Sequence, residues 1–227
     1  MSRAIVFDLD DTLYPHERFV QSGFATVARY VATVWGIPAD AALATLHRSR
    51  QGAARGTEIQ ALCHEHGLPE RLVPELISVH RHHAPALWLD GAVRLTLGRL
   101  RADGWGLAIL TNGLPAVQAA KLAALDVRGL IDHVVYAHEH APDGKPAGAC
   151  FAAVVRCLGV DAAEAVFVGD DPVRDIGGAR RAGLRTIRTS EHRAPAVRSD
   201  ADAVVTRLAD VPAVASFLLE RESVHVA

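Results

Sequence analysis

Short runs of apolar and β-branched residues recur along the chain, and each of them ends in polar residues. A short run that is apolar at every position, rather than at alternate positions, is typical of a strand buried on both faces of a sheet. The pattern predicts strands at 3–8, 106–111, 133–136 and 165–170, and weaker ones at 185–188 and 203–205.

The segments between these strands have apolar residues at helical spacing. They predict helices at 90–104, 114–125, 146–159, 172–183 and 208–221. Strands that alternate with helices favour an α/β fold, in which helices cover both faces of a parallel sheet.

Residues 15–89 break this alternation, because they contain no convincing strand. Phe19, Phe24, Val27 and Val31 recur near the helical period instead. We therefore expect an all-helical domain at 15–89, inserted after the first strand of a core domain made of 1–14 and 90–227.

Composition narrows the class of protein. The 227 residues are 50% hydrophobic and 22% charged, with a formal net charge of -2. Because nucleic acids and anionic membranes favour a basic surface, we expect neither as a partner. We also expect no signal peptide and no membrane span. Cys63, Cys150 and Cys157 have no metal-site or redox spacing, which favours reduced, buried thiols and a cytoplasmic protein.

The first predicted strand ends in Asp8-Leu9-Asp10-Asp11-Thr12. Side chains alternate along a strand, so Asp8 and Asp10 point the same way, at the sheet edge where parallel α/β folds bind ligands. Two crowded carboxylates repel each other, and a bound Mg²⁺ would relieve that repulsion. The alternative interpretation is an aspartate-rich turn that caps a helix.

Three other strand ends favour the first interpretation. Thr111-Asn112-Gly113 offers a hydroxyl, an amide and a backbone that an anion can approach closely. Lys145, followed by Pro146 as the expected first helical residue, would neutralise a phosphate and a carboxylate nucleophile. The run from Gly169 to Asp175 adds carboxylates for a metal. Together these groups indicate phosphoryl transfer.

These motifs resemble those of the haloacid dehalogenase-like (HAD) superfamily. Asp8-Leu9-Asp10-Asp11-Thr12 resembles its DxDxT motif, Thr111 its second motif, Lys145 its third, and Gly169-Asp170 through Asp175 its GDxxxxD motif. The resemblance covers nearly the whole chain. It implies a Rossmann-like core with a helical cap inserted after the first motif.

The resemblance also implies a role for each motif residue. Asp8 would attack phosphorus and form an aspartyl-phosphate, and Asp10 would act as acid and then as base. Mg²⁺ would be held by Asp8, Asp170 and the Asp10 backbone carbonyl, with Asp175 or Asp171 in support. Phosphoryl oxygens would be bound by Thr111 and Asn112, and negative charge would be offset by Lys145.

Asp10 bears on the choice between reactions. Dehalogenases of the superfamily generally lack an acid at this position, because a halide leaving group needs no proton. The presence of Asp10 favours a phosphatase or a phosphomutase over a dehalogenase, and the function expected first is a Mg²⁺-dependent phosphatase. A phosphomutase of the same architecture is the alternative. A non-enzymatic protein on this fold would be expected to lack one of the motif residues.

The substrate is expected to be a small phosphorylated metabolite, such as a nucleoside monophosphate or a sugar phosphate. Arg48, Arg50 and Arg55 surround a glycine-containing turn in the helical segment. Two interpretations of these arginines stay open. Arg55 and its neighbours contact an anionic substrate, or they are solvated charges on an exposed loop.

Overall fold

The computed structural model describes residues 3–52, 55–193 and 200–223. The described chain forms two compact units. The core unit contains the residues up to His16 and those from Trp88 onward, and the helical unit is Glu17–Leu87.

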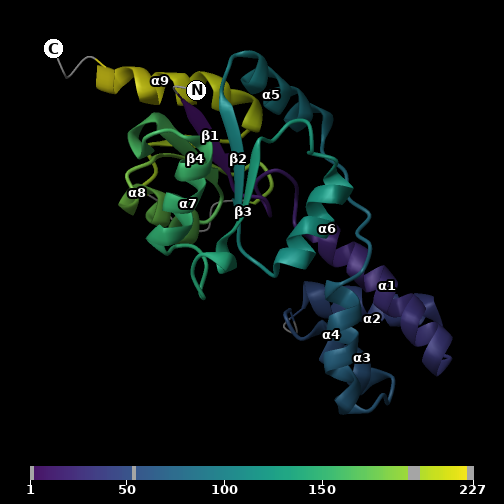
Figure 1. Ribbon diagram of the computed structural model, residues 1–227. Helices are drawn as coiled ribbons and strands as arrows, with labels where there is room; N and C mark the ends of the chain where they lie inside the picture. The colour runs from purple at the N-terminus through teal and green to yellow at the C-terminus, as the bar shows by residue number, and fades with distance from the viewer. Residues whose placement is uncertain (1–2, 53–54, 194–199, 224–227) are drawn as a thin grey trace. The chain divides into compact units, whose positions relative to one another are not determined.

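The core unit is built on a parallel sheet, which confirms the predicted α/β fold (Figure 1). In the described residues its six strands run in the order β3-β2-β1-β4-β5-β6. In the central strand β1, Ala4 pairs with Gly106 of β2 and with Ala165 of β4. The strands are β1 Ala4–Phe7, β2 Gly106–Thr111, β3 His133–Tyr136, β4 Ala165–Gly169, β5 Arg185–Thr189 and β6 Ala203–Val205.

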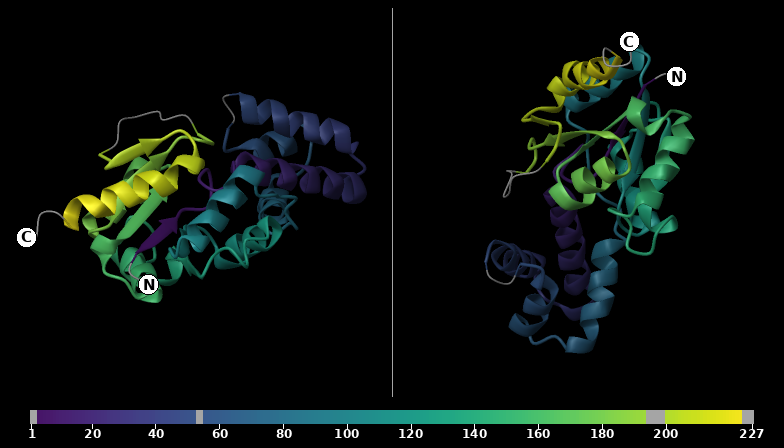
Figure 2. Two further views of the ribbon diagram at one scale, coloured as in Figure 1. Left: turned by 90° about the horizontal axis from the view of Figure 1, so that it is seen from above. Right: turned by 90° about the vertical axis from the view of Figure 1, so that its left-hand side faces the viewer.

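Helices cover both faces of this sheet (Figure 2). On one face, Phe151 of α7 meets Phe167 of β4 edge to face, with ring centroids 5.4 Å apart. The opposite face is covered by α5 and α9, which pack against β2 and β5. The helices are α5 Gly91–Ala102, α6 Pro115–Leu125, α7 Gly148–Leu158, α8 Gly178–Arg181 and α9 Val211–Ser223.

Two helix starts differ from the sequence prediction. The Lys145–Pro146 peptide bond is cis and α7 begins at Gly148, so Pro146 is not the first helical residue. The segment after β4 begins with a π-helical turn, Pro172–Gly177, rather than with a regular helix. The Asp171 carbonyl accepts hydrogen bonds from two successive backbone amides there, which widens the turn.

The helical unit has a hydrophobic core of its own. Phe24, Val27 and Val31 of α1 pack with Leu46 and Leu62 of the next two helices. No strand occurs in the described part of 17–87. The helices are α1 Glu17–Trp35, α2 Ala39–Gln51, α3 Glu58–Glu65 and α4 Val73–Arg81.

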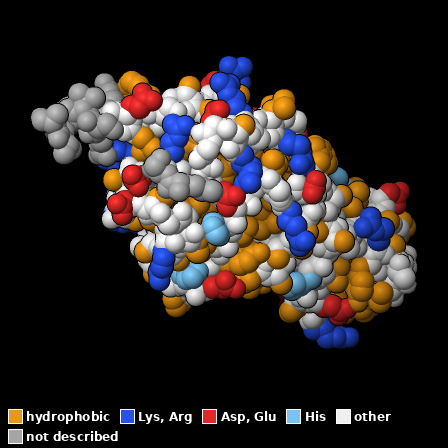
Figure 3. Space-filling view, turned by 45° about the horizontal axis from the view of Figure 1, so that its top comes forward, with side chains coloured by type: hydrophobic (Ala, Val, Ile, Leu, Met, Phe, Trp, Pro, Cys, Tyr) orange, Lys and Arg blue, Asp and Glu red, His pale blue; other side chains and the backbone are white. Residues whose placement is uncertain are grey.

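No described helix combines the length and apolar character needed to cross a bilayer. On the face drawn in Figure 3, side chains of both charges are interspersed with apolar ones. Cys63 and Cys150 are buried, whereas solvent reaches Cys157 in the last turn of α7. The expectation of a buried thiol is therefore wrong at Cys157.

Candidate active site

The first strand delivers Asp8 to the carboxyl end of the sheet. β1 is fully buried, and the Asp8 amide continues its ladder by donating to the Val168 carbonyl at 2.9 Å. The chain then turns sharply, with Asp11 in the left-handed region at φ 60°. Aspartate tolerates this conformation better than most residues do. Asp8 is consequently held at the base of a turn, with 7% of its surface exposed.

Lys145 bridges two of the carboxylates. Its Nζ lies 2.6 Å from Asp8 Oδ1 and 2.7 Å from Asp175 Oδ1. The Asn112 side chain fixes the Lys145 backbone, because it accepts from the amide at 2.8 Å and donates to the carbonyl at 3.2 Å. Gly144 has φ 65°, and a Cβ there would lie 2.6 Å from Asn112 Oδ1. The preceding glycine is thus required for this close approach.

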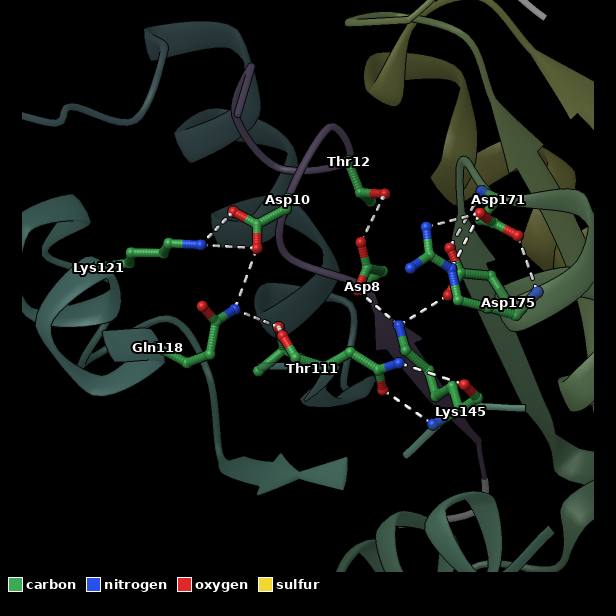
Figure 4. A network of polar contacts seen from close by, with 11 residues as sticks. Asp8, Asp10, Thr12, Thr111, Gln118, Lys121, Lys145, Asp171 and Asp175 are labelled. Carbon is green, nitrogen blue, oxygen red and sulfur yellow. Dashed lines mark hydrogen bonds and ion pairs between the residues drawn. The ribbon is translucent and has the colours of Figure 1, made fainter. Parts of the chain in front are cut away.

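Asp10 has a separate set of partners (Figure 4). Lys121 Nζ lies 2.8 Å from each oxygen of the Asp10 carboxylate. The Tyr14 hydroxyl donates to Oδ1, and the Gln118 amide donates to Oδ2 at 3.1 Å. The same Gln118 amide donates to Thr111 Oγ1 at 2.6 Å. Asp10 and Thr111 are therefore connected through one side chain.

Three buried carboxylates could hold a metal ion. Asp8, Asp170 and Asp175 each offer one oxygen, and these oxygens lie within 4.8 Å of one another. Asp171 is engaged elsewhere, since Oδ1 accepts from the Val173 and Arg174 amides and Oδ2 pairs with the Arg174 guanidinium. A set of oxygen donors suits Mg²⁺ better than it suits softer metals.

The electrostatics of the cluster also fit a cation. Burial and the nearby Asp175 raise the pKa of Asp8 to about 8, although Lys145 opposes the shift. Burial, Asp175 and Asp11 likewise raise the pKa of Asp170 to about 6. Burial opposes charge on Lys145, but Asp175 and Asp8 raise the pKa of its ammonium. One ammonium thus faces more carboxylate charge than it balances.

Asp10 behaves in the opposite way. Burial alone would raise its pKa, but the charges of Lys121 and His16 and the hydrogen bonds from Lys121 and Tyr14 lower it. Burial and the Asp10 carboxylate raise the pKa of Tyr14, so the phenol keeps its proton and donates it. Asp10 is therefore held as a carboxylate in the substrate-free site.

One cavity of about 260 Å³ brings most of the predicted residues together. Thr111 is not among its lining residues, because its hydroxyl is covered by Gln118 and only 1% of the residue is exposed. Arg193 also reaches the cavity, with Nη1 3.3 Å from Asp170 Oδ2. The predicted residues that line it are Asp8, Asp10, Asn112, Lys145, Asp170 and Asp175.

The arginines of the helical unit have different surroundings. Arg50 forms salt bridges with Glu17 at 2.9 Å and with Glu58 at 3.1 Å, and Arg48 is also paired within this unit. Arg55 is exposed on the turn between α2 and α3. Unlike Arg48 and Arg50, Arg55 forms no salt bridge with the described residues. Its contact with a substrate stays a prediction.

The sequence analysis missed Lys121, Gln118 and Tyr14. A signal for the first two was present in α6, because its remaining residues are apolar. Polar residues three apart lie on one face of a helix. A polar pair on an otherwise apolar helix that follows a strand end indicates a buried polar contact.

The chain is similar in sequence to known hydrolases. The family profile of the haloacid dehalogenase-like hydrolases matches residues 2–183. The chain is 31% identical to a glyceraldehyde 3-phosphate phosphatase of Methanopyrus kandleri, over 83% of this chain and 84% of the relative. It is also 31% identical to a ribulose-1,5-bisphosphate 5-phosphatase of Halopiger xanaduensis, over 82% and 84%.

The same architecture is found in proteins of known structure. The magnesium-bound HAD-hydrolase YfnB of Bacillus subtilis superposes with a TM-score of 0.67 at 21% identity, covering 94% of this chain and 98% of that one. At this level of identity, the superposition supports the fold alone.

Proposed function

The chain belongs to the haloacid dehalogenase-like hydrolases, and from this membership we propose that it is a Mg²⁺-dependent phosphatase of small phosphomonoesters. The observation that carries the proposal is the pair of aspartates at the end of β1. Asp8 and Asp10 line one cavity, yet each is paired with a different lysine. Two carboxylates with separate surroundings can take separate chemical roles.

In the first half-reaction, Asp8 is the nucleophile. A carboxylate oxygen of Asp8 attacks phosphorus, and the bond from phosphorus to the ester oxygen breaks as the aspartyl-phosphate forms. The leaving oxygen takes a proton from Asp10 and departs as an alcohol. The approaching phosphate is itself negative, and that charge raises the proton affinity of the Asp10 carboxylate, which takes up a proton from solvent before the transfer.

In the second half-reaction, Asp10 is the base. Water attacks phosphorus and gives its proton to Asp10, and the bond between Asp8 and phosphorus breaks. Inorganic phosphate leaves, and Asp8 returns to a free carboxylate. Once phosphate has left, Asp10 releases this proton to solvent and returns to the carboxylate of the substrate-free site.

The metal is assigned to the carboxylate cluster. Mg²⁺ would be held by Asp8, Asp170 and Asp175, with the Asp10 backbone carbonyl. The negative charge of the carboxylates exceeds the positive charge of Lys145, which supports a divalent cation. Bound there, the ion shields the phosphate dianion from the carboxylates and orients the phosphoryl group. Asp175 is preferred to Asp171 as the supporting ligand, because Asp171 already caps the following turn.

The phosphoryl oxygens are assigned to Asn112 and Lys145. Both line the cavity, and the Lys145 ammonium lies beside the attacking carboxylate. Thr111 joins them once its hydroxyl leaves Gln118 or shares the bond with it. The helical unit is proposed as a cap that excludes water, with Arg55 as its candidate contact to an anionic substrate.

Phosphate esters are favoured over halogenated acids. An alkoxide leaving group needs a proton and a halide does not, and Asp10 lies two residues from the nucleophile. Two relatives that align with most of this chain are named as phosphatases of glyceraldehyde 3-phosphate and of ribulose 1,5-bisphosphate. Both of these substrates are small sugar phosphates. The substrate is therefore proposed to be a small phosphorylated metabolite. The three free cysteines fit a reducing compartment such as the cytoplasm.

The test is a screen for phosphate release. Purified protein is incubated with triose, pentose and hexose phosphates, phosphoserine and nucleoside monophosphates, with Mg²⁺ or with a chelator. We expect inorganic phosphate from at least one ester, and loss of that activity on chelation. Isomerisation of a sugar phosphate without free phosphate would identify a mutase instead. Halide release from 2-haloacids without phosphatase activity would contradict the proposal.

A further inference from the structure

The chain contains 22 arginines but only two lysines. Both lysines are 3% exposed, and both contact an aspartate of the first strand end. Lysine concentrates its charge in a compact ammonium, whereas arginine spreads it over a planar fork. The use of lysine at these two positions alone points to a specific need for a compact cation at each.

The two lysines serve different carboxylates. Lys145 joins Asp8 to Asp175, which is the pairing expected for a nucleophile. Lys121 contacts both oxygens of Asp10 at 2.8 Å, and its own side chain is 4% exposed. A charge this buried is stable only when paired, so Lys121 and Asp10 constrain each other.

Gln118 extends this constraint to Thr111 at the end of β2. It precedes Lys121 by three residues on α6, which places both side chains on one face. Its amide contacts Asp10 Oδ2 and Thr111 Oγ1 together. A rotation of the Asp10 carboxylate would therefore break bonds to three groups, including the Tyr14 hydroxyl.

We propose that Lys121 is a positioning residue for the acid/base step, which orients the Asp10 carboxylate toward the leaving oxygen, with Gln118 linking that orientation to Thr111. The inference rests on the proposed phosphatase activity and deepens it. Lys121 contacts Asp10 rather than the nucleophile, so its loss affects proton transfer more than attack on phosphorus.

This division can be measured through the leaving group. A nitrophenolate leaves without a proton, whereas an alkoxide needs one from Asp10. Single-turnover release of the alcohol or phenol isolates the first half-reaction. The two substrates are 4-nitrophenyl phosphate and the best alkyl phosphate from the screen, and the two proteins are wild type and Lys121→Met.

We expect Lys121→Met to slow the alkyl ester by roughly 10²-fold and 4-nitrophenyl phosphate by less than about 5-fold, within the range of acid–base contributions. Asp10→Asn should show the same preference for the activated ester. The double variant should be no slower than Asp10→Asn, because both changes remove one function. Lys121→Arg keeps the charge and should recover part of the alkyl-ester rate.

The controls separate the possible failures. Circular dichroism and the melting temperature establish that each variant is folded. Equal slowing of both esters by Lys121→Met, in a folded protein, would show a merely structural role and overturn the inference. If wild type hydrolyses neither ester, the proposed function fails first. If wild type hydrolyses both and Lys121→Met matches it, only the role of Lys121 fails.

Discussion

At the scale of single residues, two aspartates separated by one residue have opposite electrostatic surroundings. Burial and Asp175 raise the pKa of Asp8, whereas Lys121 and the Tyr14 hydroxyl overcome burial and lower that of Asp10. Carboxylates whose pKa values are moved apart by their environments commonly divide the work of nucleophile and acid/base. The shifts differ because Asp8 shares Lys145 with the Asp175 carboxylate, whereas Lys121 contacts both oxygens of Asp10.

The nucleophile assignment predicts the behaviour of Asp8→Asn. The amide keeps the shape of the side chain but cannot attack phosphorus, so we expect turnover to fall by more than about 10³-fold. Because burial and Asp175 raise the pKa of Asp8, its charge is unfavourable in the metal-free fold. We therefore expect the melting temperature without metal to stay level or rise. Phosphate-release assays and thermal melts measure the two effects.

The control for this variant is Asp40→Asn, at an exposed position of α2. It should change neither the rate nor the melting temperature. An Asp8→Asn protein that is folded and hydrolyses an ester at the wild-type rate would refute the nucleophile assignment.

At the scale of elements, the site forms where strand ends meet helix faces and loops. Asp8 follows β1, Asn112 follows β2 and Asp170 follows β4, which are adjacent in the sheet. The carboxyl ends of parallel strands share one edge, so the sequence order of the motifs already predicts that these groups meet.

What the sequence did not predict depends on side chains that reach across elements. Lys121 contacts a residue 111 positions away, and hydrophobic periodicity carries no information on such a pair. The π-helical turn after β4 was also missed, because it depends on the geometry of the Asp171 carbonyl rather than on residue type. Strands with continuous apolar runs were placed well, but the expected burial is wrong for β3, an edge strand in which His133 and Val134 are exposed.

A partly exposed carboxylate that joins β2 to α5 supplies a stability test. Asp132 Oδ2 accepts from the Leu107 amide of β2 at 2.8 Å, and Oδ1 pairs with Arg101 of α5 at 2.5 Å. Burial opposes ionisation, but these two partners lower the pKa of Asp132 below its ordinary value of 3.8. Its stabilisation is therefore complete above the unfolded pKa and is lost as the pH falls through the folded one.

We expect Asp132→Ala to lower the free energy of unfolding by about 1–3 kcal/mol at neutral pH, because the Leu107 amide loses its acceptor. The difference from wild type should narrow between about pH 5 and pH 3. Urea unfolding at each pH measures it. The control, Asp103→Ala, removes an exposed pair with Arg99 and should cost less than about 0.5 kcal/mol. A difference in the free energy of unfolding between Asp132→Ala and wild type that is constant over this pH range would contradict the assigned interactions.

At the scale of the whole molecule, each unit buries apolar side chains of its own. The core unit packs Phe151 and Phe167 between sheet and helix, and the helical unit packs Phe24 and Leu46 among its helices. All three carboxylates of the candidate metal site belong to the core unit. Metal binding therefore couples directly to the stability of one unit and not to that of the other.

Hydrogen exchange measured by mass spectrometry tests this separation. Mg²⁺ alone should slow exchange in the peptides around β1 and β4, and leave α2, α3 and α4 unchanged, because a ligand stabilises the elements that bind it. Inorganic phosphate added with Mg²⁺ should then slow exchange in the turn that carries Arg55, if the helical unit acts as a cap. Asp175→Asn, which removes a proposed ligand, should abolish the effect of Mg²⁺. Equal protection of both units by Mg²⁺ alone would show that the metal does not act through the core cluster.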